Sequence, residues 1–289
     1  EDDEFGWDPD WNDTEDPEED FEDDPDPNGR ERTFLHRFEL GDEGTVRYHA
    51  TGQVEGWILN QFSISEYEGY VRVATMKDRG GWEPESMAFV LQARSKSGVL
   101  QAQTGNQAEF LDVVGELRGI GLGEDLYAAR FKGDVGYLVT FMEWDPLWIV
   151  DLGTPTKPRL RGHLEVPGFS TYLHPIANQK LLGVGRAGPD DGIKLSLYDV
   201  GNLDNPVAID EHVEGSWGSD SEAIDEHRAF RYLPEEKLVI LPMTHSTEQG
   251  LYIYSLDERS GFDFARRITH DGMVDGGSAS ATVRRAYHI

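Results

Sequence analysis

The chain has 289 residues and no cysteine, and its formal net charge is −29, with 55 acidic residues against 26 lysines and arginines. This length is enough for one large domain or two small ones, and the lack of cysteine excludes disulfides, thiolate metal sites and cysteine nucleophiles. The acidity argues against nucleic acid and anionic membranes as partners, and no stretch of about 18 apolar residues predicts a membrane span.

Residues 1–29 form a separate acidic segment, with 16 aspartates and glutamates and no lysine or arginine. The segment has few aliphatic side chains, so it cannot bury enough apolar area to offset the entropy lost on ordering. We therefore expect residues 1–29 to be a disordered leader, or one ordered only by calcium or by a partner.

Calcium is the one cofactor that the sequence suggests. Oxygen-bearing side chains alternate with spacer residues in the leader, as they do in calcium-binding loops. The candidate ligands are Asp8, Asp10, Asp13, Asp24, Asp26 and Asn28. The glycine and the closing glutamate of a complete EF-hand are missing from the expected offsets.

Residues 30–289 have a different sequence pattern, with short β-rich runs bounded by glycine, proline, asparagine and aspartate. Examples are VRYHA, WILNQFSIS, YVRVATM, MAFVLQA, LYAARF, GYLVTFM, LWIVDL, KLSLYDV and LYIYSL. Helical periodicity is scarce. Many short strands at regular spacing predict an all-β domain, which could be a sandwich, a barrel or a propeller.

An internal repeat favours the propeller. Val139, Val184 and Val239 occupy matching strands and are separated by 45 and then 55 residues. Each unit has a strand, a second strand that ends in an acid-containing turn, and a third strand. A spacing of about 40–50 residues is typical of a propeller blade. The sequence thus predicts about four antiparallel blades in residues 30–289.

Several segments carry a family resemblance, among them GQVEGWILNQFSISEYEGYVRVAT, GLGEDLYAARFKGDVGYLVTF, GHLEVPGFSTYLHP and SEAIDEHRAF. Together they resemble the beta-propeller-domain family, secreted proteins with a C-terminal β-propeller distantly related to WD-40 repeats. The Asp-Leu-Gly-Thr-Pro turn is similar to the LVIVD-type repeats of bacterial surface propellers. The resemblance implies a propeller fold and a secreted, extracellular or cell-envelope location, and it implies little about activity.

The resemblance also implies an incomplete ring. The family's domain is longer than this chain, and the final residues RRAYHI fall within an expected strand. Four blades leave open strand edges at both ends of the series. We therefore expect the remaining blades of the same protein, or a protein partner, to cover those edges.

Two segments bring polar side chains into loops that we expect at the central channel. GFSTYLHP supplies His174, and SEAIDEHRAF supplies Glu222, Asp225 and His227. Histidines and carboxylates together could ligate a metal or form an acid–base pair. Equally, they could hydrogen-bond between strands and hold turns in place.

Three functions fit these features. The one we favour is an extracellular, non-enzymatic binding or scaffold module whose leader could bind calcium, because no complete catalytic constellation is present. The second is a metal-dependent hydrolase or oxidoreductase that uses His174, Glu222, Asp225 and His227. The third is a structural subunit of a surface assembly.

Overall fold

The computed structural model describes residues 31–78, 83–94, 109–142, 145–188, 191–245 and 248–269, together with Arg284. These residues contain 18 β-strands and four short 3-10 helices, and no α-helix occurs among them. No helix in this part of the chain has the length and apolarity to cross a membrane. The candidate calcium ligands between Asp8 and Asn28 lie outside the described residues.

Sixteen of the strands form four meanders, which we call blades 1 to 4. Within each blade, strands consecutive in sequence pair antiparallel. Blade 1 has β3 (Ile64–Tyr67), β4 (Tyr70–Asp78), β5 (Pro84–Arg94) and β6 (Glu109–Ile120), and blade 2 has β7 (Asp125–Lys132), β8 (Val135–Phe141), β9 (Asp145–Asp151) and β10 (Arg159–Val166). Blade 3 has β11 (Phe169–Pro175), β12 (Lys180–Arg186), β13 (Ile193–Asp199) and β14 (Val207–Glu214), and blade 4 has β15 (Arg231–Leu233), β16 (Leu238–His245), β17 (Glu248–Asp257) and β18 (Gly261–Ile268).

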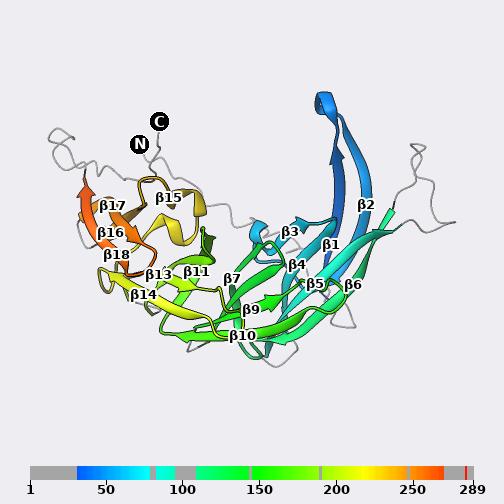
Figure 1. The fold of residues 1–289 in the computed structure, drawn as a ribbon, viewed down its shortest axis with the longest axis horizontal. Helices are drawn as coiled ribbons and strands as arrows, with labels where there is room; N and C mark the ends of the chain where they lie inside the picture. The colour runs from blue at the N-terminus through cyan, green and yellow to red at the C-terminus, as the bar shows by residue number, and fades with distance from the viewer. Residues whose placement is uncertain are drawn as a thin grey trace, which may run out of the picture.

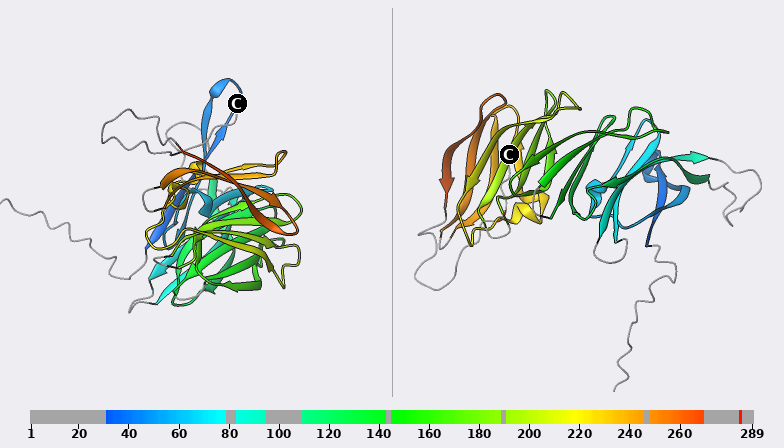
Figure 2. Two further views of the ribbon diagram at one scale, coloured as in Figure 1. Left: turned by 90° about the vertical axis from the view of Figure 1, so that its left-hand side faces the viewer. Right: turned by 90° about the horizontal axis from the view of Figure 1, so that it is seen from below.

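The blades follow one another along a curved path, with blade 1 and blade 4 at its two ends (Figures 1 and 2). The first strand of each blade, β3, β7, β11 or β15, lies on the inner side of the curve, and the last strand lies on the outer side (Figure 1). This radial order of four-stranded antiparallel sheets is the arrangement of a β-propeller. The all-β propeller with four blades is therefore confirmed.

The sequence repeat corresponds to the blades. Val139, Val184 and Val239 lie on β8, β12 and β16, the second strands of blades 2, 3 and 4, and all three side chains are buried. These strands have neighbours on both sides and a blade against at least one face, so their sequences are nearly continuous apolar runs.

Apolar clusters fill the spaces between the blades. One joins blades 1 and 2, another joins blades 2 and 3, and the largest joins blades 3 and 4. Leu138, Tyr198 and Tyr254 are among the side chains that these clusters bury almost completely. Burial of each such side chain stabilises the fold by about 1.5–3 kcal/mol, so the interfaces between blades hold the arc together.

A hairpin of β1 (Arg32–Leu40) and β2 (Val46–Glu55) extends blade 1, and the sequence analysis predicted only part of its second strand. Residues Ala50–Gly52 of β2 pair in parallel with Glu109–Leu111 of β6, which makes a six-stranded sheet. We call this hairpin the arm, because its tip projects away from the blades (Figure 1).

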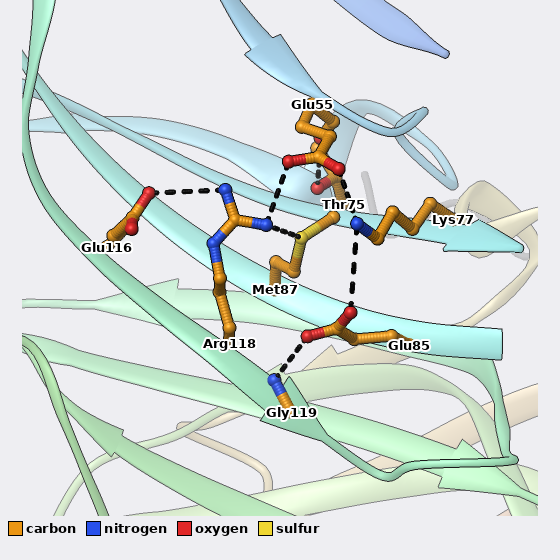
Figure 3. A network of polar contacts seen from close by, with 8 residues as sticks. All are labelled: Glu55, Thr75, Lys77, Glu85, Met87, Glu116, Arg118 and Gly119. Atoms are coloured by element: carbon orange, nitrogen blue, oxygen red, sulfur yellow. Dashed lines mark hydrogen bonds and ion pairs between the residues drawn. The ribbon is translucent and has the colours of Figure 1, made fainter. Parts of the chain in front are cut away.

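A polar network fastens the base of the arm to blade 1 (Figure 3). Glu55, the last residue of β2, accepts hydrogen bonds from Lys77 of β4 and from Arg118 of β6, the latter at 2.8 Å. These two bonds, with the Lys77 bond as the larger effect, hold the pKa of Glu55 below its usual value despite the opposing effect of burial. The arm is thus joined to blade 1 by ion pairs as well as by strand pairing.

Candidate functional site

Side chains of blades 2 and 3 meet those of the short segments that lead into blades 1 and 4 at the inner side of the arc. Phe62 lies in the 3-10 helix η2 (Gln61–Ser63) just before β3. Its ring centroid is 4.8 Å from that of His227 and 5.5 Å from that of Tyr172, and the guanidinium carbon of Arg130 lies 4.3 Å from it. We call the group formed by Phe62, Arg130, Tyr172, His174 and His227 the axial cluster. It brings blade 1 into contact with blade 4.

Local sequence explains how the two ends of this cluster are placed. At η2, the side chain of Asn60 accepts a hydrogen bond from the backbone N–H of Phe62 at 2.9 Å, and Ser63 completes a capping box. The N-cap interaction ends the extended backbone and starts the helical turn. Opposite it, Glu226 caps η4 (His227–Ala229), and the side-chain bond from Arg228, followed by the backbone bond, lowers the pKa of Glu226 to about 2.

His174 is a neutral part of the cluster. It lies on β11, so the expectation that GFSTYLHP is a loop is wrong; the segment forms the innermost strand of blade 3. Nδ1 of His174 is 3.0 Å from the hydroxyl of Tyr172, and the ring packs 5.4 Å from that of Phe230. Burial, and then the nearby charges of Arg130 and Lys132, lower the pKa of His174 to about 4.

Arg130 differs in its environment from several other arginines of the chain. Arg37, Arg118, Arg159, Arg161, Arg186 and Arg228 each form an ion pair with a carboxylate. Within the described residues, no such pair involves Arg130, and its guanidinium lies over the face of the Phe62 ring. A guanidinium has five N–H donors in a planar fork that suits carboxylates and phosphates. The axial cluster therefore has the chemistry to bind an anion.

The amide of Gln61 adds a polar group beside His227. Its nitrogen lies 3.2 Å from Nε2 and 3.4 Å from Nδ1 of His227. The hydroxyl of Tyr172 and the guanidinium of Arg130 complete a set of hydrogen-bonding groups arranged around aromatic rings. Aromatic surface with a few fixed polar groups is typical of ligand sites.

The family comparison agrees with this architecture. The family model described as "Beta propeller domain" matches residues 19–289. The chain belongs to the beta propeller domain family. Two relatives are an uncharacterized protein of Archaeoglobus fulgidus, 37% identical over 78% of this chain and 31% of its own length, and an uncharacterized protein of Methanocaldococcus jannaschii, 39% identical over 66% and 28%.

The chain thus spans about a third of the length of these curated relatives. Among solved structures, Sqt1 from Chaetomium thermophilum is similar with a TM-score of 0.45 and 13% identity, over 74% of this chain and 51% of that chain. A propeller can serve as a rigid binding or scaffold module, and family membership supports that general role for this chain.

The two predicted carboxylates lie in another part of this propeller. Glu222 and Asp225 line a cavity of about 340 Å³, together with Asp220, Ser221, Pro242, Met243, Thr244 and Arg284. Neither His174 nor His227 is among the lining residues. In the part of the chain that the structure describes, no group of three or more histidines and carboxylates is arranged to hold a metal ion. The catalytic and metal-binding roles of these four residues stay predictions.

Sequence reasoning placed His174 and His227 together but missed Phe62 and Arg130. The run WILNQFSIS predicts a strand at Phe62, whereas the structure has a 3-10 helix there, and the Asn60 and Ser63 pair is the cap signal for that helix. The run LYAARF predicts a strand but does not single out Arg130, its one charged residue. A charged residue at the inner strand of a blade was the signal that could have drawn attention to it.

Proposed function

We propose that this propeller is a non-enzymatic binding module whose axial cluster holds an anionic side chain of a protein partner. The observation that supports the proposal is that Arg130 forms no ion pair with any carboxylate in the part of the chain that the structure describes, and stacks on Phe62 instead. An acid-rich protein has ample means to pair an arginine internally. A guanidinium kept on the axis without such a pair is available for an external carboxylate.

The surroundings of Arg130 favour a carboxylate next to an aromatic or apolar group. Phe62 and Tyr172 present ring surface, and Gln61 and His227 add hydrogen-bonding groups. Contacts among blades 1 to 4 hold these side chains in place before binding, which reduces the entropy lost on association. The partner can be a separate protein or further blades of the same protein.

A peptide titration tests this proposal. The probe is a synthetic peptide of alternating glutamate and tyrosine, added to the full chain while the imidazole NMR signals of His174 and His227 are followed. We expect saturable shifts that are lost in Arg130→Gln. The control is Arg266→Gln, which changes an exposed arginine on the outer strand β18 and leaves the titration intact. Equal binding by both variants, or no saturable shift in the unaltered chain, contradicts the proposal.

We also propose that the module works outside the cell and that calcium orders its acidic leader. Extracellular calcium modules bind with dissociation constants of about 10⁻⁴–10⁻³ M. Calorimetry with the full chain should give calcium binding in that range, lost in Asp24→Asn/Asp26→Asn and retained in the control Glu18→Gln/Glu19→Gln. Unchanged binding in the aspartate variant would remove these residues as ligands.

A further inference from the structure

The two faces of the arm have different environments. Side chains alternate between the faces of a strand, and residues directly opposite on paired strands share a face. Leu35, Ala50 and Val54 point to one face and are buried in the core of blade 1. This buried face fixes the position of the arm.

The opposite face exposes large apolar side chains to solvent. The extra residue of the bulge near Arg37 and Phe38 is His49 on β2, so β1 keeps a regular alternation. The members of the exposed face, with their exposed fractions, are Phe34 (67%), Phe38 (54%), Leu40 (83%), Val46 (63%) and Tyr48 (37%). The Phe38 and Tyr48 rings pack edge to face at 5.4 Å. We call these five side chains the arm face.

The arm face is uncharged along most of its length. The strand register places His36, Thr51 and Gln53 on the same side, and the charged pair Arg32 and Glu55 lies only at the base. Ion pairs at that base and the Arg37–Glu66 pair at 2.6 Å hold the arm against blade 1. A fixed, contiguous apolar patch of this kind marks an interaction site on a soluble protein.

The amount of apolar surface fits a second copy of the chain. Given typical side-chain areas, the five residues expose on the order of 500 Å² per copy, so two facing copies would bury about 1,000 Å², the lower limit for a specific interface. Two-fold packing needs one self-complementary surface, and a flat apolar face without charges satisfies that requirement. We propose that two copies pack their arm faces against each other across a two-fold axis.

The salt dependence of association distinguishes a second copy of this acidic chain from a basic partner. Each copy has a formal net charge of −29, so two copies repel each other at low ionic strength. Salt screens that repulsion over a Debye length of about 10 Å at 0.1 M, while apolar contacts persist. The association of two copies should therefore strengthen with added salt, whereas binding to a basic partner would weaken.

Sedimentation equilibrium of the full chain tests the dimer. We expect a monomer–dimer equilibrium with a smaller dissociation constant at 0.5 M than at 0.05 M sodium chloride. Phe38→Lys should weaken it by about 100-fold or more, which corresponds to about 3 kcal/mol. The matched control is Glu39→Lys, which changes the neighbouring residue on the other face. Circular dichroism establishes that both variants fold.

Two outcomes would overturn the dimer. One is a monomer at every concentration and salt level, which is the result expected if another part of a longer protein or a different partner covers the arm face. The other is an equal effect of Phe38→Lys and Glu39→Lys, since the two side chains lie on opposite faces of β1. A dimer that Phe38→Lys disrupts and Glu39→Lys preserves supports the arm face as its interface.

Discussion

His174 shows how burial at the axis of the propeller determines protonation. Its pKa is lowered to about 4, first by burial and then by Arg130 and Lys132. The folded state therefore keeps a neutral ring at pH values where the unfolded chain, with a pKa near 6.5, becomes protonated. Above about pH 6.5 the ring is neutral in both states, so the free energy of unfolding is at its full value. As the pH falls towards 4, protonation of the unfolded chain lowers that free energy.

The first prediction concerns this pH dependence. The difference between about 4 and 6.5 corresponds to up to about 3 kcal/mol of folding stability. Urea unfolding should show a loss of that order between pH 7 and pH 4, and His174→Gln should be less sensitive to pH in this range. His163→Gln, at a half-exposed position on β10, serves as the control and should behave like the unaltered chain. An unchanged pH dependence in His174→Gln would refute the assignment.

The second prediction connects Arg130 to the same ring. Arg130→Gln removes a positive charge that disfavours protonated His174, so the pKa of His174 should rise. Because burial is the larger cause, the pKa should stay below its ordinary value. An NMR titration of the histidine signals measures this directly. A pKa that does not move, or that falls, would show that Arg130 does not act on His174.

At the residue scale, composition and motif predicted part of the site. Two unusual polar segments identified His174 and His227, and both reach the axial cluster. Glu222 and Asp225, from the same segment as His227, line a cavity to which neither histidine contributes. The carboxylates are separated from His227 because the chain turns at η3 (Glu222–Ile224) and again at η4. The local sequence does not determine the direction in which such short turns point their side chains.

At the element scale, the repeated turns were predictable because their chemistry is local. Asp151, Asp199 and Asp257 each end the third strand of a blade, and each accepts a backbone hydrogen bond from two residues further along. That Asx-type turn is visible in sequence as Asp followed two positions later by glycine or a polar residue. The arm was not predictable in the same way, because apolar residues on both faces of β1 conceal the two-residue alternation.

The third prediction concerns the attachment of the arm. Glu55→Gln weakens the bonds from Lys77 and Arg118, so the backbone amides of β1 and β2 should exchange hydrogen faster. Exchange in blades 3 and 4 should not change. The control is Glu66→Gln, which removes only the exposed contact with Arg37 and should have a smaller effect. Uniformly faster exchange across the chain would show that the network stabilises the whole fold and not the arm.

Because the lowered pKa of Glu55 reflects the same bonds, acid should weaken the attachment too. Glu55 contributes stability above the carboxyl's ordinary pKa, and this contribution is lost as the pH falls through the lower folded-state value. The protection factors of the arm amides, which correct for the slower intrinsic exchange in acid, should therefore fall on acidification in the unaltered chain. In Glu55→Gln, which has no charge to lose there, the fall in protection should be smaller.

At the scale of the whole molecule, the axial cluster connects the ends of the arc. Neighbouring blades share apolar clusters, and the segments that lead into blades 1 and 4 meet through Phe62 and Gln61 on one side and His227 on the other. Phe62 also packs against the apolar cluster between blades 3 and 4. The sequence repeat predicted blades 2 to 4, since each repeat is one meander. It could not predict this contact, because the two segments are separated by 166 positions in the chain.

The last prediction follows from that connection. Phe62→Ala removes ring contacts to Tyr172, His227 and Arg130, so it should destabilise the fold by about 2–4 kcal/mol. Because blade 1 would lose its contact with blade 4, urea unfolding should broaden, with blade 1 unfolding before blades 3 and 4. The control is Phe264→Ala, at a half-exposed position on β18, which should shift stability less and keep a single transition. If Phe62→Ala unfolds in one sharp transition with unchanged stability, then the shared apolar clusters alone hold the arc, and the axial cluster is free to rearrange when a partner binds.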